Sequence, residues 1–342
     1  MDMNLAVRAA QAAERLPSRC CDRDALLRHG STRAWLNACV SGSLPVATEP
    51  VDVPGRLGCV ALGWADAQYP SGLRHLRHPP PALFVRGAPL PLPDVELSVA
   101  IIGARRCTEL GRGVARDLAR GLARAGVVVV SGLALGIDAA AHEGALDGGG
   151  QTLAVLASPV SQPSPRRNLS LAEEILESGG WLLSERPPGA QLRAHDFPRR
   201  NRLVAGLTRL VVVVEAGLRS GTLSTVGHAL DLGLEVAAVP GPVTSPASAG
   251  AHELLRRGAQ IVTSVRDVLE LLRRSASSPP ELCPLSPDAR TLKEALPGAQ
   301  GSTAQWLDAS GLPRDRAISA LHSLLSRGEL RRLPGGRIAR CL

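Results

Sequence analysis

Unbroken apolar runs alternate with amphipathic stretches through the middle of the chain. Helical periodicity predicts helices near 110–125, 137–147, 168–178 and 222–232. Strands that are apolar at every position are buried on both faces, which is typical of a parallel sheet covered by helices. The predicted fold class is therefore α/β, with a doubly wound, parallel Rossmann-like sheet over 97–272. The expected strands are 98–102, 127–130, 152–157, 181–185, 210–216, 235–240 and 260–264.

Smaller modules are predicted before and after this domain in the sequence. Residues 1–50 contain two or three short amphipathic helices (a SAM-like module), and a proline-rich connecting segment at 51–96 leads into the core. A linker rich in serine and proline covers 273–287. Residues 288–342 show three helical stretches followed by two short strands around a Pro-Gly-Gly turn, which predicts a winged-helix-like domain.

Composition narrows the choice of partner. The chain has 342 residues and a formal net charge of +8, and 38 of its 39 basic residues are arginine because Lys293 is the only lysine. A basic chain favours polyanionic partners. Only four Trp, two Phe and one Tyr are present, which argues against the multi-ring stacking platforms of many single-strand binders.

Cysteine usage and hydropathy indicate a cytoplasmic protein. The seven cysteines form no C-x-x-C pair, so we expect free thiols rather than a disulfide framework or a metal site. The start MDMNLAVRAAQAAERL lacks the apolar core of a secretory signal. The apolar runs are too short to span a bilayer, so no membrane partner is expected.

Candidate chemistry lies where the predicted strands end, because ligands of open parallel sheets bind outside the carboxyl ends of the strands. Three turns there are rich in glycine and hydroxyl residues, at 103–106, 131–138 and 217–222. Such turns let backbone N–H groups face an anion at a helix N-terminus. The residues of these turns that we expect to contact the anionic ligand are Arg105, Ser131, Gly132, Gly136, Ser220, Gly221 and Thr222.

The usual nucleotide signatures are absent from the sequence. The first turn lacks the G-x-G-x-x-G spacing, and the second strand ends in a serine without an acidic residue placed for a ribose hydroxyl. No G-x-x-x-x-G-K-[ST] motif occurs either. We therefore expect no dinucleotide cofactor, no P-loop NTPase activity and no metal.

The densest basic stretch is 186–219, and within it residues 195–202 stand just before a buried strand. Guanidinium groups in a row suit the phosphates of a nucleic-acid backbone. We interpret 195–202 as an extended segment in which the neighbours His195 and Asp196 point apart and have a structural role. The expected phosphate contacts in this stretch are Arg199, Arg200, Asn201 and Arg202.

Together these residues resemble the DNA processing protein A (DprA, also called Smf) family. The resemblance covers about 60–265 with the order of its motifs intact. These motifs include Asp66-x-x-Tyr69-Pro70, Gly103-x-Arg105, Ser131-Gly132-Leu133-Ala134-x-Gly136-Ile137-Asp138, Phe197-Pro198-x-Arg200-Asn201-Arg202 and Arg219-Ser220-Gly221-Thr222.

The resemblance implies a non-enzymatic protein that binds single-stranded DNA, forms a homodimer, protects incoming DNA and promotes loading of the recombinase RecA during natural transformation. Where family members commonly have Tyr-Pro-x-x-Asn, this chain has Ser164-Pro165-Arg166-Arg167-Asn168. The ring is lost there, and Arg166, Arg167 and Asn168 become expected phosphate contacts. His252 replaces an asparagine in a region that is a candidate dimer or RecA surface.

Two other functions stay open at this point. Nucleotide phosphoribohydrolases share the Rossmann-like superfamily, but their glutamate three residues after the turn threonine corresponds to Thr225 here. A winged-helix transcriptional regulator would bind duplex DNA through the C-terminal domain, with Arg314 and Arg316 on its last helix and Arg331 and Arg332 in the wing.

Overall fold

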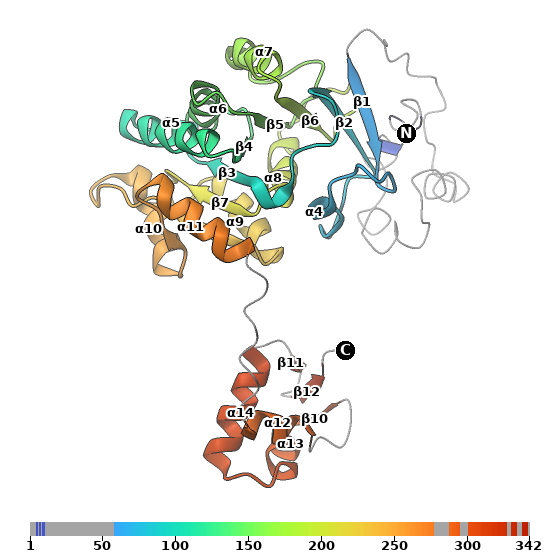
Figure 1. The fold of residues 1–342 in the computed structure, drawn as a ribbon, viewed down its shortest axis with the longest axis vertical. Helices are drawn as coiled ribbons and strands as arrows, with labels where there is room; N and C mark the ends of the chain where they lie inside the picture. Colours follow the sequence, from blue (N-terminus) through green and yellow to red (C-terminus); the bar gives the residue numbers. More distant parts are fainter. Residues whose placement is uncertain are drawn as a thin grey trace. The chain divides into compact units, whose positions relative to one another are not determined.

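The computed structural model describes residues 58–276, 287–294, 300–326, 330–333 and 337–340, together with Leu5, Val7, Ala9 and Ala10. Apart from those four residues, the predicted N-terminal module lies outside the described residues, as does most of the predicted linker. The chain divides into two units, Met1–Ala276 and Ser277–Leu342 (Figure 1).

The first unit is built on a nine-stranded sheet in the order β1-β2-β6-β5-β4-β3-β7-β8-β9. Strands β3 to β9 are parallel to one another, which confirms the predicted α/β class with a Rossmann-like parallel sheet. These strands are β3 (Ser98–Ile102), β4 (Val128–Ser131), β5 (Thr152–Leu156), β6 (Trp181–Ser184), β7 (Leu210–Val213), β8 (Glu235–Ala238) and β9 (Gln260–Ile261).

Two antiparallel strands extend the sheet at the β6 edge. They are β1 (Cys59–Gly63) and β2 (Ala82–Gly87), and β2 pairs with β6. The segment 51–96, expected to be a connection, thus supplies part of the sheet. Its apolar runs Cys59–Gly63 and Ala82–Gly87 are short and lie in a segment rich in proline, so their strand pattern is weak.

Helices cover both faces of the sheet. Val99 and Ile101 of β3 pack with α5 (Glu109–Arg124), α6 (Ile137–Asp147) and α11 (Val265–Ala276). Ala100 and Ile102 belong to the core on the other face. That core also contains residues of α7 (Leu169–Glu177), α8 (Asp196–Gly206), α9 (Thr222–Asp231) and α10 (Ala249–Arg256).

The expectation of an extended segment at 195–202 is wrong, because Asp196–Gly206 form the helix α8. Proline at the third helical position is compatible with the first turn, where no intrahelical partner is needed for its nitrogen. The buried positions include Arg200 and Arg202. Charged residues at buried positions conceal the apolar periodicity by which the other helices were predicted.

In its described residues, the second unit combines three helices with a small antiparallel sheet. Its helices are α12 (Pro287–Glu294), α13 (Thr303–Ala309) and α14 (Arg314–Ser326). A three-stranded antiparallel sheet follows the order β10-β12-β11, and Trp306 and Leu324 lie in the core between them. Arg316 of α14 forms a salt bridge with Asp288 at 2.6 Å. The strands are β10 (Gln300–Ser302), β11 (Leu330–Leu333) and β12 (Arg337–Arg340).

Within the described ranges, none of the helices combines the length and the apolar character that crossing a bilayer requires.

Histidine 142 of α6 is fully buried in a neutral form. The hydroxyl of Thr152 donates to the carbonyl of Val129 at 2.6 Å, so it accepts from Nδ1 of His142 at 2.8 Å. The opposite ring nitrogen, Nε2, has no hydrogen-bond partner among the residues that the structure describes. Burial, with a smaller effect of the Arg200 charge, lowers the pKa of His142 from 6.5 to about 3.

We expect this histidine to make the protein less stable in mild acid. The unfolded chain binds a proton at His142 as the pH falls below 6.5, whereas the folded chain does not until about pH 3. The free energy of unfolding should therefore fall by roughly 1.4 kcal/mol per pH unit in this window. Urea unfolding of the wild type and of His142→Leu between about pH 6 and 4.5 should show the steeper loss only in the wild type. Equal slopes would show that the folded protein holds the charged ring.

Candidate functional site

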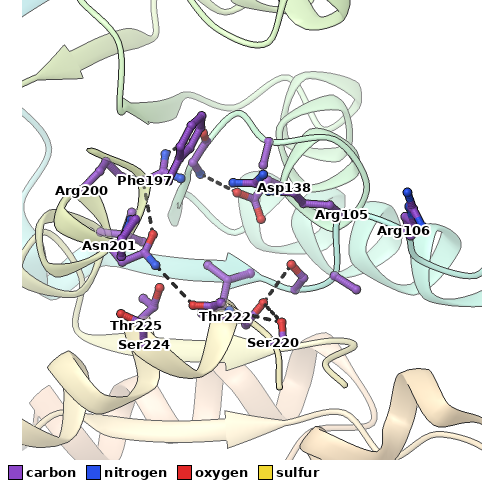
Figure 2. A pocket seen from close by; sticks show the side chains of 18 of the residues that line it. Arg105, Arg106, Asp138, Phe197, Arg200, Asn201, Ser220, Thr222, Ser224 and Thr225 are labelled. Carbon is purple, nitrogen blue, oxygen red and sulfur yellow. Dashed lines mark hydrogen bonds between the residues drawn. The ribbon is translucent and has the colours of Figure 1, made fainter. Parts of the chain in front are cut away.

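A cavity of about 720 Å³ opens at the carboxyl end of the central strands. The chain passes from β3 to β4 on one side, whereas β7 lies on the other side of β3. This is the switch point at which doubly wound sheets bind ligands. Figure 2 shows residues converging on it from the turns after β3 and β4, from the start of α8 and from the start of α9.

Glu215 fixes the turn after β3. Its backbone carbonyl accepts from the Ala104 nitrogen at 2.7 Å, and its buried carboxylate accepts from the backbone nitrogen of Thr108 at 2.9 Å and from the Thr108 hydroxyl. Arg105 and Arg106 lie between these anchors and are exposed. Within the described parts of the chain, neither forms a salt bridge with an acidic side chain. The turn therefore holds two uncompensated positive charges at the rim of the cavity.

An aromatic ring lies beside these charges. The guanidinium carbon of Arg105 is 4.7 Å from the centroid of the Phe197 ring, within the range of a cation–π contact. Phe197 is half-buried in the first turn of α8 and lines the cavity. Phe197 is not among the contacts that the sequence predicts, because the low aromatic content argues against stacking. Its place in the Phe197-Pro198-x-Arg200 motif was the available signal.

Arg200 lies beneath the cavity rather than at its rim. Only 5% of the residue is exposed, and Nη1 donates to the carbonyls of Gly132, at 2.6 Å, and Val155. Burial lowers the pKa of Arg200, the nearby Arg105 lowers it further, and Asp138 opposes both. An arginine stays charged under these conditions, so Arg200 supplies a buried positive charge that joins the ends of β4 and β5.

Asp138 is the acidic residue that lines this cavity. One carboxylate oxygen, Oδ2, accepts from the Gly132 nitrogen at 3.1 Å. Burial raises the pKa of Asp138, whereas the Arg200 charge and hydrogen bonds from the backbone of Ala134, Gly132 and Gly103 lower it. Three arginines, 105, 106 and 200, thus face one carboxylate, and the cavity favours an anionic ligand.

The turn before α9 is tied to its neighbours. The Thr222 hydroxyl donates to the Gly103 carbonyl at 3.0 Å and accepts from the Ser220 hydroxyl at 2.9 Å. The Asn201 amide donates to the carbonyl of Gly221 at 3.3 Å. The N-terminus of α9 therefore lies at the cavity, where its dipole favours negative charge.

Seven of the predicted residues meet at this cavity, and seven do not line it. Those that line it are Arg105, Gly132, Arg200, Asn201, Ser220, Gly221 and Thr222. The Ser131 hydroxyl instead donates to Ile101 O at 2.7 Å and is fully buried. Gly136 has φ +85°, and a Cβ there would lie 2.3 Å from the carbonyl oxygen of Ala104, so it is a packing position.

The side chains of the arginine run lie in different directions, because a helix turns successive side chains away from one another. Arg202 is buried and paired with the buried carboxylate of Glu185, and Arg199 reaches the same carboxylate at 3.2 Å. Asn168 is buried too, donating to the Leu133 carbonyl at 2.9 Å. The exposed residues Arg166 and Arg167 lie in the short 3₁₀ helix η3 (Arg166–Asn168), outside the cavity lining.

In the described part of the chain, no group of three or more His, Cys, Asp and Glu side chains is arranged to hold a metal ion.

A family model described as DNA recombination-mediator protein A matches residues 61–273. The chain is 47% identical to a DNA processing protein DprA of Mycobacterium tuberculosis over 234 residues, which are 66% of this chain and 60% of that protein. It is 37% identical to protein Smf of Escherichia coli over 285 residues, covering 80% of this chain and 76% of that protein. The chain thus spans about 60% of the length of the mycobacterial relative.

Two solved structures are similar in fold and sequence. DNA processing protein A from Streptococcus pneumoniae superposes with a TM-score of 0.58 at 31% identity, covering 79% of this chain and 93% of that one. DNA processing protein A from Helicobacter pylori, a protein with a unique single-stranded DNA binding mode, gives a TM-score of 0.57 at 31% identity, covering 64% and 97%.

Proposed function

This chain belongs to the DNA recombination-mediator protein A family, and we propose that it binds single-stranded DNA at the cavity between the ends of β3 and β7. In this proposal it acts without catalysis or cofactor. It protects incoming DNA in natural transformation and promotes loading of RecA. The observation that carries the proposal is the juxtaposition of Arg105 and Arg106, exposed and without acidic partners in the described residues, with the half-buried ring of Phe197.

This arrangement suits a single strand better than a duplex. A ring inside a cavity can stack only on a base that has left the double helix, and base–aromatic stacking tolerates any sequence. The arginines address phosphates, which carry no sequence information. Binding should therefore show little sequence preference. The structure of the H. pylori relative, named for its binding of single-stranded DNA, supports this ligand class.

Among the described residues that line the cavity, none supplies the free carboxylate that the hydrolase alternative needs. Thr225 lines the cavity where the phosphoribohydrolases have a glutamate, and the Asp138 carboxylate already accepts hydrogen bonds from the backbone. In the second unit, the salt bridge between Arg316 and Asp288 removes one charge from the surface that a duplex-binding regulator would use. Contact of this unit with duplex DNA remains a secondary part of the proposal.

The double variant Arg105→Ala/Arg106→Ala should weaken single-strand binding without lowering the melting temperature. Each lost phosphate contact should flatten the log–log salt dependence by about 0.7, so the slope should decrease by about 1.4. Fluorescence anisotropy with labelled oligo-dT at several salt concentrations measures both quantities.

The matched control is Arg124→Ala/Arg273→Ala, which removes the same charge from two exposed arginines near the ends of α5 and α11. We expect its salt slope to match that of the wild type. Equal losses in the two double variants would show that DNA responds to net charge alone and that the cavity is not the site.

A homodimer is proposed through the free edge of the sheet. Strand β9 ends the strand order, and an apolar groove of about 630 Å³ lies between it, β8, α9 and α10. Leu230 of α9, Ile261 of β9 and Leu218 in the turn before α9 are more than 60% exposed. An exposed edge with apolar neighbours is a surface that a second chain can cover.

Sedimentation equilibrium tests the dimer. Leu230→Glu/Ile261→Glu should yield a monomer, because two charges would be buried in an apolar interface. The control Leu110→Glu changes an equally exposed leucine on α5 and should leave the dimer intact. A dimer that survives the first variant would place the interface elsewhere.

A further inference from the structure

A carboxylate of the protein itself occupies the backbone cradle at the head of the cavity. We define the cradle as the N–H groups of Gly103, Gly132 and Ala134, which surround the Asp138 carboxylate in the first turn of α6. Asp138 is 7% exposed and lines the cavity. The donors come from two different turns, so this one side chain joins the ends of β3 and β4.

In doubly wound folds, such turns and the helix N-terminus behind them commonly receive a ligand phosphate. Here the donors are already engaged by Asp138. The adjacent guanidinium of Arg200 is held on the carbonyls of Gly132 and Val155. A second anion entering the cradle would find its donors occupied and would meet a buried negative charge, whose repulsion is weakly screened.

We propose that Asp138 is a specificity-determining residue, whose carboxylate acts as a resident anion that keeps the phosphates of free nucleotides out of the cradle. Phosphate groups are then held outside the cradle, by Arg105 and Arg106 at the rim. The cavity therefore selects a strand that lies across it over a mononucleotide that enters it. The part of the inference that concerns a strand rests on the proposed function, whereas exclusion of phosphate from the cradle does not.

The inference predicts a gain of binding when the carboxylate is removed. Asp138→Ala leaves the N–H groups of Gly103, Gly132 and Ala134 unpaired beside a buried guanidinium, and inorganic phosphate fits that donor set. Asp138→Asn is the matched control, since it removes the charge but keeps the cradle filled by a side chain of the same shape.

Isothermal titration of the full-length proteins with inorganic phosphate tests the proposal, with chloride adjusted to keep ionic strength constant. We expect Asp138→Ala to bind phosphate about tenfold or more tightly than the wild type or Asp138→Asn. Formate, a free carboxylate, should raise the melting temperature of Asp138→Ala and leave that of the wild type unchanged. Wild-type protein that binds phosphate or AMP as tightly as Asp138→Ala would overturn the proposal, as would a folded Asp138→Ala that binds neither phosphate nor formate.

If Asp138→Ala does not fold in chloride buffer, its circular dichroism spectrum in phosphate or formate shows whether an added anion restores the fold. Recovery of the wild-type spectrum in either anion, at matched ionic strength, supports a vacated anion cradle, and failure to recover in both overturns it. Oligo-dT binding by the wild-type protein is measured in parallel. Absence of that binding, with the phosphate results as expected, would contradict the proposed function and leave the role of Asp138 standing.

Discussion

Replacing Arg202 by alanine should lower the free energy of unfolding by about 3–5 kcal/mol, because it leaves a buried carboxylate without its main partner. Glu185 and Arg202 are both less than a tenth exposed, and the Arg202 guanidinium donates to the Glu185 carboxylate. Arg199 contacts the same carboxylate at 3.2 Å but is one-third exposed, so it can compensate only in part.

The same variant should not alter the salt dependence of DNA binding. Arg202 does not line the cavity, so no phosphate contact is lost. Chemical unfolding and anisotropy on one preparation measure both effects. The double variant Glu185→Leu/Arg202→Leu is the control, because removing both charges of a buried pair costs much less than removing one. An unchanged free energy of unfolding together with a flatter salt slope would instead show that Arg202 contacts DNA phosphates.

This contrast shows what the sequence could and could not predict about the arginine run. Residues 199–202 are rich in guanidinium groups, which indicates phosphate binding when the backbone is taken as extended. Once they form α8, Arg200 points beneath the cavity and Arg202 points toward Glu185. The charge of a side chain gives no information on its direction, and the direction depends on a helix whose apolar pattern is interrupted by these same arginines.

The parallel strands were predictable for the opposite reason. β3 and β7 are buried at every position, and continuous burial leaves a signal in the sequence that no charged residue interrupts. The ends of those strands located the cavity, since ligands of this architecture bind there. The role of Glu215 was not predictable, because its carboxylate contacts Thr108, more than a hundred residues away in the chain.

The family resemblance and the sheet argument gave the same cavity but different details. Both pointed to Arg105 and to the turn at 220–222, and the structure brings these together. Neither separated Gly132, which lines the cavity, from Ser131, whose hydroxyl is used within the sheet. Neighbouring residues of a turn can face opposite sides, so a motif indicates a location more reliably than it assigns each side chain.

A second large effect is expected from Gly132→Ala. A Cβ atom at this position would clash with both terminal nitrogens of Arg200. The guanidinium must therefore move and break its hydrogen bonds to the carbonyls of Gly132 and Val155. Hydrogen bonds from a charged donor contribute about 1.5–3 kcal/mol each, so loss of the two should lower the free energy of unfolding by about 3–6 kcal/mol. The control Gly113→Ala has no atom within 4 Å of the new Cβ and lies in α5, where alanine should raise stability by about 0.5–1 kcal/mol.

A double-mutant cycle identifies the cause of the Gly132→Ala effect. If the new methyl group acts by displacing Arg200, then Gly132→Ala should cost little in an Arg200→Ala background, because the displaced group is already absent. Arg200→Ala alone should be strongly destabilising, since it leaves two buried carbonyls and the Asp138 carboxylate without their cation. An equal cost of Gly132→Ala in both backgrounds would place the strain in the turn itself, where Leu133 already has a φ of +55°. Urea unfolding of the four proteins distinguishes a turn that holds the buried arginine from a turn that is merely tight.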